Sequence, residues 1–136
     1  MSYGTAAALQ AAVFQRLTAD TVLAGLVGSA IYDSAPPGST DGTYVSIGPE
    51  DSRDASDQTS RGALHEFVVS VVTTQAGFQT AKTVASAISD SLVDSQLVLA
   101  RGRLVGLWFL KARARRVEAG DVRRIDLVFR ARTEDN

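Results

Sequence analysis

The last third of the chain alternates between apolar and polar residues more regularly than any other part of the sequence. The alternation covers Arg103–Val117 and Val122–Thr133, which are joined by residues 118–121. A period of two is typical of strands that bury one face, because successive side chains point to opposite sides. The pattern therefore predicts a C-terminal β-hairpin with one apolar face.

The register of this hairpin follows if Val117 pairs with Val122, since facing positions then have numbers that add to 239. The pairs on the first face are all apolar: Trp108–Ala131, Leu110–Phe129, Ala112–Leu127 and Ala114–Ile125. The pairs on the second face are Phe109–Arg130, Lys111–Val128, Arg113–Asp126 and Arg115–Arg124. A slip by one residue would mix the two faces, so the register is well specified.

Basic side chains gather on the second face of the hairpin. The six that share it are Lys111, Arg113, Arg115, Arg124, Arg130 and Arg132. Arg113 opposite Asp126 is a favourable pair, whereas Arg115 opposite Arg124 is unfavourable unless an anionic partner lies nearby. The basic face is either a solvated sheet surface or a surface that meets nucleic acid or an acidic neighbour.

The same face begins with three large apolar residues, Val105, Leu107 and Phe109. A solvent-facing sheet seldom carries three such side chains in a row, and exposed apolar patches mark interaction sites. We therefore expect this end of the face to be a contact between subunits.

Helical periodicity marks two longer segments, Thr5–Thr18 and Phe78–Val93. The other predicted elements are a short helix at Val22–Val27 after the capping residue Asp20, strands at Ile31–Tyr32, Tyr44–Ile47 and Leu64–Thr74, and a further short strand at Gln96–Ala100. Helices and hairpins that segregate in this way indicate one α+β domain over residues 1–136. We expect a single, mostly antiparallel sheet with the two main helices packed on one face.

The stretch Gly48–Gly62 is the most polar part of the chain and is predicted to be a long loop. Its charged residues include Glu50, Asp51, Arg53, Asp54 and Asp57. Loops of this length in compact domains are usually functional or mobile.

Charge is unevenly distributed, although the 136-residue chain carries 14 basic and 15 acidic residues. Residues 1–100 hold four basic and ten acidic side chains, and residues 101–136 hold ten basic and five acidic. Such asymmetry indicates a nucleic-acid surface or head-to-tail contacts between copies. Cysteine is absent, no apolar run could cross a bilayer, and Met1 begins no basic leader. We expect cytosolic synthesis and no membrane contact.

No residue pattern indicates catalysis. His65 is the only histidine, so no second histidine or cysteine can join it in a metal site. The sequence contains no G-x-S-x-G elbow and no phosphate-binding glycine motif. We expect no cofactor, no metal and an ordinary strand role for His65. A hydrolase that uses His65 is the alternative that loss of a measured activity in His65→Ala would support.

Nucleic-acid contact by the basic face would be blind to sequence. The face lacks aromatic stacking positions, and the chain lacks a recognition helix. Contacts to DNA would therefore go to phosphates.

Three segments together resemble a known family: Tyr32–Gly38, Tyr44–Gly48 with Arg53–Asp57, and Leu99–Leu107. They are similar to the small tail-completion or tail-terminator proteins of long-tailed phages, and most of all to the version in gene transfer agents of alphaproteobacteria. The similarity covers nearly the whole chain. It implies an α+β domain with an antiparallel sheet and flanking helices.

The resemblance implies a structural protein and not an enzyme. It implies a ring, a hexamer, that caps the finished tail tube and joins it to the head connector, with DNA passing through the lumen. The expected partners are other copies of the chain, the tail tube protein, the head connector or stopper protein, and DNA in transit. The expected location is the bacterial cytoplasm during assembly, then the head–tail junction of the particle.

Within such a ring, we expect the six basic residues to line either the lumen or a subunit seam. The polar stretch Gly48–Gly62 would contact the tube or the connector. The competing class is a stand-alone nucleic-acid-binding module without sequence preference, which a steeply salt-dependent DNA affinity of the monomer would favour.

Overall fold

The computed structural model describes residues 3–34, 42–93, 95–117 and 121–135. Its elements follow the order α1 (Ala6–Ala19), α2 (Thr21–Val27), β1 (Ile31–Tyr32), β2 (Thr43–Asp54), β3 (Gly62–Thr73), α3 (Gln79–Leu92), β4 (Arg103–Val117) and β5 (Val122–Glu134). The turn expected at 118–121 and the loop around Pro36–Gly38 lie wholly or partly outside the described residues.

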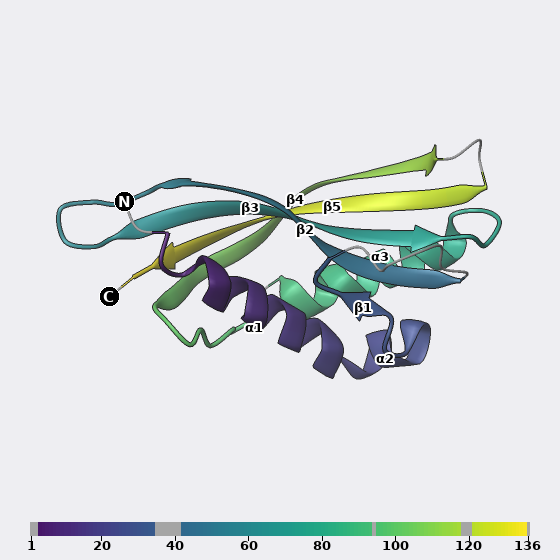
Figure 1. Ribbon diagram of the computed structural model, residues 1–136, viewed down its shortest axis with the longest axis horizontal. Coiled ribbons are helices and arrows are strands. Elements are labelled where there is room, and N and C mark those ends of the chain that lie inside the picture. The colour runs from purple at the N-terminus through teal and green to yellow at the C-terminus, as the bar shows by residue number, and fades with distance from the viewer. Residues whose placement is uncertain (1–2, 35–41, 94, 118–120, 136) are drawn as a thin grey trace.

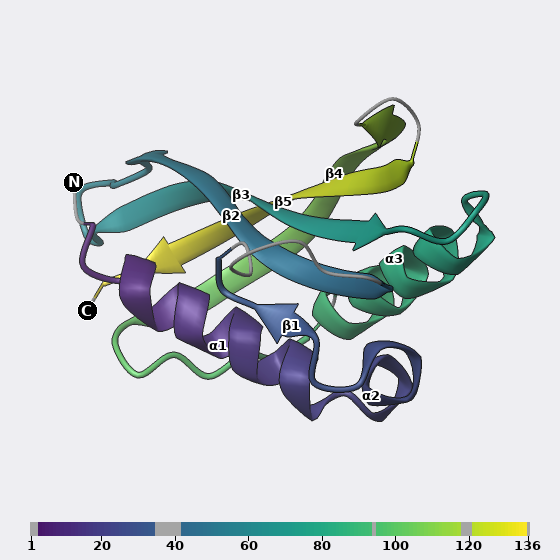
Figure 2. The same ribbon diagram turned by 45° about the vertical axis from the view of Figure 1, so that its right-hand side comes forward.

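The strands form a sheet in the order β1-β2-β3-β5-β4. The pairing of β1 with β2 is parallel, and the other three pairings are antiparallel. All three described helices lie on one face of this twisted sheet (Figures 1 and 2). The predicted α+β architecture, with its mostly antiparallel sheet and C-terminal hairpin, is confirmed.

The core lies between the helices and the sheet. Its largest buried members include Leu9, Val13, Leu17, Val84, Ile88, Leu92, Val69, Val71 and Phe129. These residues recur at helical spacing in α1 and α3 and at alternate positions in β3, as the apolar pattern predicts. Burying one such side chain stabilises the fold by about 1.5–3 kcal/mol.

Local signals fix the short helix α2. One side-chain oxygen of Asp20 accepts hydrogen bonds from the backbone N–H of Val22, at 2.9 Å, and of Leu23, at 3.1 Å. The helix ends at Gly28, whose φ of 61° lies in the left-handed region. None of the helices in the described part of the chain has the length and hydropathy of a membrane-spanning helix.

The predicted long loop Gly48–Gly62 is largely a strand, so that prediction is wrong. The strand β2 continues to Asp54 and pairs with β3 through Ala63–Phe67, after a register shift between Ile47 and Glu50. The segment is polar because it lies at an edge of the sheet, where its side chains are exposed or at most half-buried. Only residues 55–61 remain as a turn, which Asp57 holds by accepting hydrogen bonds from the backbone N–H groups of Thr59 and Ser60.

The predicted hairpin register is confirmed for Lys111–Val117 and is wrong from Phe109 towards Arg103. Leu110 is an extra residue in a β-bulge, so that Phe109 faces Phe129 instead of Arg130. A second irregularity lies between Leu104 and Gly106. The segment expected as a strand at Gln96–Ala100 is not part of a strand.

The aromatic rings explain why the bulge is favourable. Phe129 stacks on Phe67 with ring centroids 5.6 Å apart and meets Phe109 edge-on at 5.8 Å. Aromatic pairs in these geometries stabilise by about 0.5–1.5 kcal/mol beyond burial alone. The bulge brings Phe109 to the helix side of the sheet, where this cluster forms.

Candidate functional site

The sheet face away from the helices gathers the six predicted basic residues. In β5 the residues Ile125, Leu127 and Phe129 are buried, so the alternate positions face outwards. The register places the β4 cations opposite these outward positions, with Arg115 facing Arg124 and Lys111 facing Val128. The six side chains that share this outer face are Lys111, Arg113, Arg115, Arg124, Arg130 and Arg132.

Asp126 neutralises the unfavourable arginine pair. It lies 2.8 Å from the guanidinium of Arg124 and 3.5 Å from that of Arg115, and it accepts a 2.6 Å hydrogen bond from the Ser70 hydroxyl. Burial acts to raise the pKa of Asp126, but these hydrogen bonds and charges outweigh it and hold the pKa below its usual range. The expected anionic partner therefore belongs to the chain itself, and Asp126 contacts Arg115 and not its register partner Arg113.

The remaining cations differ in their partners. Arg130 lies 3.6 Å from Glu66, and Arg132 donates a 3.3 Å hydrogen bond to the carbonyl of Ala55. Among the described residues, no acidic side chain lies within ion-pair distance of Lys111 or Arg113. These two line a cavity of about 450 Å³ on the outer face, together with Pro49, Val68, Arg115, Arg124, Asp126 and Val128. They are the part of the basic face that is best placed to meet an external anion.

The charged residues predicted to contact the tube or the connector lie on the β2–β3 hairpin. Glu50, Asp51, Arg53 and Asp54 belong to β2, and Asp57 lies in the turn that follows. Hydrogen bonds from the Ser56 hydroxyl and backbone N–H lower the pKa of Asp54, and those from Thr59 and Ser60 lower the pKa of Asp57. Both carboxylates therefore remain charged well below neutral pH.

The apolar subunit contact predicted at Val105, Leu107 and Phe109 needs correction, because the two bulges place these residues differently. Leu107 is only 6% exposed and belongs to the core of the chain itself. Val105 and Phe109 remain 42% and 43% exposed, beside Trp108 and Leu110 at 46% and 38%. The exposed apolar set is therefore Val105 and Trp108–Leu110, along the free edge of β4.

A groove lies between α3 and the β4–β5 hairpin, where sequence reasoning predicted none. Its volume is about 520 Å³. Its strand side consists of Phe109, Ala112, Ala114, Ile125 and Leu127, and its helix side of Lys82, Ala85, Ser86, Ser89 and Asp90. No described helix covers the Ala112–Ala114 part of β4, and both alanines are exposed.

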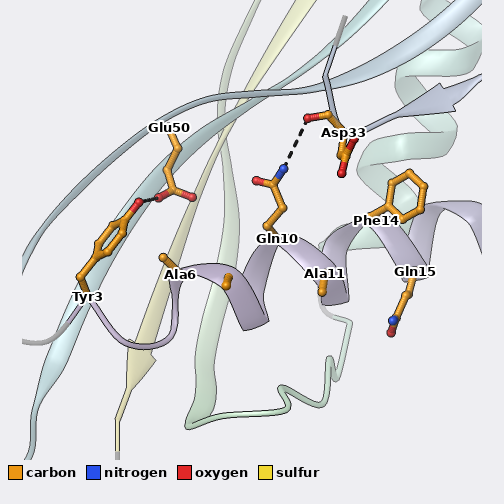
Figure 3. A pocket seen from close by; sticks show the side chains of 9 residues that line it. Tyr3, Ala6, Gln10, Ala11, Phe14, Gln15, Asp33 and Glu50 are labelled. Atoms are coloured by element: carbon orange, nitrogen blue, oxygen red, sulfur yellow. Dashed lines mark hydrogen bonds between the residues drawn. The ribbon is translucent and has the colours of Figure 1, made fainter. Parts of the chain in front are cut away.

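A hollow of about 580 Å³ lies at the opposite side of the molecule, between α1 and β2 (Figure 3). Its residues are Tyr3, Ala6, Ala7, Gln10, Ala11, Phe14, Gln15, Asp33 and Glu50. Tyr3 donates a 3.4 Å hydrogen bond to Glu50, and the Gln10 amide donates one of 3.5 Å to the carbonyl of Asp33. The exposed alanines of α1 are the one sequence signal for this hollow, but α1 and β2 could not be paired from sequence.

His65 is fully buried in a polar cluster where α1 begins. Its Nδ1 lies 2.8 Å from the Ser52 hydroxyl, and its Nε2 lies 3.0 Å from the Thr133 hydroxyl and 3.4 Å from that of Thr5. Burial lowers the pKa of His65 and outweighs the charge of Glu50, 3.9 Å from Nδ1, which acts to raise it.

The cluster around His65 lacks the order of a nucleophile relay. In a relay the histidine holds the serine with one ring nitrogen and the carboxylate with the other. Here Ser52 and Glu50 both lie at Nδ1, while Nε2 faces two buried threonines. Among the described residues, no group of three histidine, aspartate and glutamate side chains is close enough to hold a metal ion.

The fold and these surfaces define a small α+β domain with a basic outer sheet face, a free apolar strand edge and a hollow on the opposite side. A family profile described as "Tail completion protein gp17" matches residues 11–134, and the chain belongs to this family. A chain in the solved structure described as "Virion of native gene transfer agent (GTA) particle" is 68% identical and superposes with a TM-score of 0.92. The match covers 98% of this chain and 99% of that chain.

These comparisons confirm the resemblance that the three sequence segments indicate. No curated protein matches the chain at a significant level.

Proposed function

We propose that this chain is a structural protein that completes the tail of a gene-transfer-agent-like particle, and that it acts without catalysis. The observation that carries the proposal is the end-to-end similarity, at 68% identity, to a chain of a gene transfer agent virion. The family match over residues 11–134 supports it independently. The chain assembles in the bacterial cytoplasm and then resides at the head–tail junction.

The finer proposal is a ring, a hexamer, between the tail tube protein and the head connector, with DNA passing through its lumen. The basic outer face lines the lumen or a subunit seam, and Lys111 and Arg113 supply its external charge. The hairpin with Glu50, Asp51, Arg53, Asp54 and Asp57 contacts the tube or the connector. Support comes from the basic β4–β5 hairpin and the acidic β2 edge, since unlike patches on one chain favour contacts that close into a cycle.

Genetic complementation tests the role in tail completion. Particle-producing cells that lack their own tail-completion protein should regain complete particles and DNA delivery when this chain is expressed. Tails that stay unjoined to heads, with the chain present and folded, would overturn the proposal.

Charge reversal tests the role of the basic face. We expect Arg113→Glu with Arg115→Glu to reduce ring assembly or DNA delivery, whereas Arg116→Glu, on the other face of the same strand, should have little effect. Normal rings and unchanged delivery in the double variant would contradict a role in lumen or seam. A steep salt-dependent affinity of the isolated monomer for DNA would favour the stand-alone nucleic-acid-binding module instead.

A further inference from the structure

We infer that copies of this chain join head to tail, with the free edge of β4 seated on the α1–β2 edge of the next copy. In this arrangement Phe109 enters the hollow between α1 and β2 on the helix side, and Lys111 and Arg113 approach Asp51 of β2 on the outer face. The inference rests on the proposed ring and assigns the two surfaces that build it.

The two surfaces are free strand edges towards the two opposite ends of the strand order. β4 is last in the strand order, and β1 pairs only with Val45 and Ser46 of β2. Among the described residues, no strand pairs with Glu50–Asp54 on the side away from β3. Exposed edges of this kind are templates for pairing with another chain.

Strand direction allows the sheet to continue from one copy to the next. Three successive antiparallel pairings separate β2 from β4, so these two strands run in opposite directions. A second copy set beside β4 with its β2 edge therefore presents an antiparallel neighbour. The geometry matches strand addition, in which backbone hydrogen bonds give affinity and side-chain pockets give specificity.

The helix layers of two such copies complement each other. β4 has an uncovered stretch beside the groove along α3, and α1 packs near the opposite edge, against β1. Edge-to-edge docking brings α1 of the next copy towards this uncovered stretch. Phe109, 43% exposed on the helix side, then faces the hollow that Ala7 and Ala11 line.

The size of the hollow suits such an insertion. At about 580 Å³ it falls within the roughly 300–1,000 Å³ typical of clefts that accept small ligands. Along its α1 side lie three alanines together with Gln10 and Gln15, and Phe14 lies towards one end (Figure 3). An aromatic side chain that enters it would bury apolar surface that both copies now expose.

Charge selects the same docking position. Glu50 lines the hollow on the helix side, so the next residue of β2, the exposed Asp51, points to the outer face of the sheet. On the other copy Lys111 and Arg113 point to the same outer face, just beyond the bulge that turns Phe109 to the helix side. An antiparallel stagger that sets Lys111 opposite Asp51 of the next copy leaves Phe109 on the helix side, the side on which the hollow lies.

The contact joins two different patches of the same chain, so a bound pair of copies still has one patch of each kind free. Repetition with a closing rotation gives a ring, whereas a two-fold dimer would place basic edge against basic edge. This distinction makes the inference testable by the pattern of cross-links.

Cysteine cross-linking in assembled particles tests the contact, because the chain itself contains no cysteine. The test variant combines Ala112→Cys on β4 with Ala11→Cys in the hollow, both at exposed alanines. After treatment with a short bismaleimide, we expect a ladder of multimers in denaturing gels. Each single variant should give monomers only, and so should the control pair Ala112→Cys with Ala24→Cys on α2, at the far end of α1.

The outcomes separate this inference from the proposed function. Dimers from the Ala112→Cys single variant, or a double variant that builds complete particles without a ladder, would overturn the head-to-tail contact and leave the tail-completion role intact. Failure of the unmodified chain to complete tails would overturn the proposed function itself. In the same cells Ala11→Arg and Ala112→Glu should each reduce complete particles at least tenfold, and Ala24→Arg should not.

Discussion

At the scale of single residues, His65 holds the start of α1 against the sheet. The imidazole is fully buried and has a hydroxyl group at each ring nitrogen. The sequence predicted a strand position for this histidine but could not predict the cluster, because Thr5, Ser52 and Thr133 come from three distant segments. Its buried position gives the fold a dependence on pH.

We predict that the stability of the domain falls as pH drops below about 6.5, the usual pKa of histidine. Burial lowers the pKa of His65 in the folded chain, so the unfolded chain takes up the proton first and is favoured by acid. Stability should therefore rise with pH between the lowered pKa and about 6.5, and then level off. Urea unfolding between pH 5 and 8 measures this slope.

The matched variant for this measurement is His65→Asn, which keeps a polar group and cannot titrate. This variant should be less stable at neutral pH. Its unfolding free energy should no longer rise with pH between about 5.5 and 6.5. An unchanged slope in this variant would assign the pH dependence to other groups.

Two glycines, Gly102 and Gly25, differ in how well their positions would accept a Cβ atom. Gly102 has a φ of 72°, and a Cβ there would collide with the carbonyl oxygen of Glu134 and the Thr5 methyl group. Gly102→Ala should cost about 1–3 kcal/mol of unfolding free energy. Gly25→Ala is the control, since it lies within α2 with open space around it and should stabilise by about 0.5–1 kcal/mol. Thermal unfolding measures the change in stability of both variants. Equal changes in the two would contradict the role of the positive φ at Gly102.

At the scale of elements, the sequence was most informative where one face is buried and least informative at edges. The helices and the hairpin from Lys111 to Val117 were predictable, because their apolar periods match the faces that they bury. The β2 extension could not be predicted, because its backbone pairs although its side chains are polar and none of them is fully buried. The bulge at Leu110 could not be predicted either, because Trp108, Phe109 and Leu110 are all apolar and the pattern alone could not show which ring joins Phe129.

Phe129 and Phe109 belong to the same aromatic cluster but differ in burial. Phe129 is fully buried and contacts rings from two neighbouring strands, whereas Phe109 is 43% exposed. Phe129→Ala should therefore cost about 3–5 kcal/mol, in the range of buried aromatic truncations. Phe109→Ala should cost clearly less in the isolated chain, yet it should impair assembly more than its effect on stability explains. Denaturant unfolding and a count of complete particles measure the two effects, and parallel losses in both would contradict an interface role for Phe109.

At the scale of the whole molecule, the basic β4–β5 hairpin and the acidic strand β2 lie towards opposite edges of one sheet. The sequence indicated the charge asymmetry but not this placement, which depends on strand order. The hollow and the groove were likewise unpredictable, since each is formed by a helix and a strand that are distant in sequence. The fold thus places the basic and the acidic segments of the chain on two separate surfaces, which can meet in successive copies.

Salt dependence tests whether this charge layout drives assembly. Attraction between exposed unlike charges weakens as ionic strength rises, since the screening length falls from about 10 Å at 0.1 M to about 3 Å at 1 M. Completion of purified tails by added protein should therefore slow with salt, because complementary charge acts mainly on the association rate. The variant Lys111→Gln with Arg113→Gln should complete tails more slowly at low salt and respond less to added salt. Arg116→Gln should keep the slope of the unmodified chain, and an equal slope in all three proteins would leave the apolar contact of Phe109 as the main driving force.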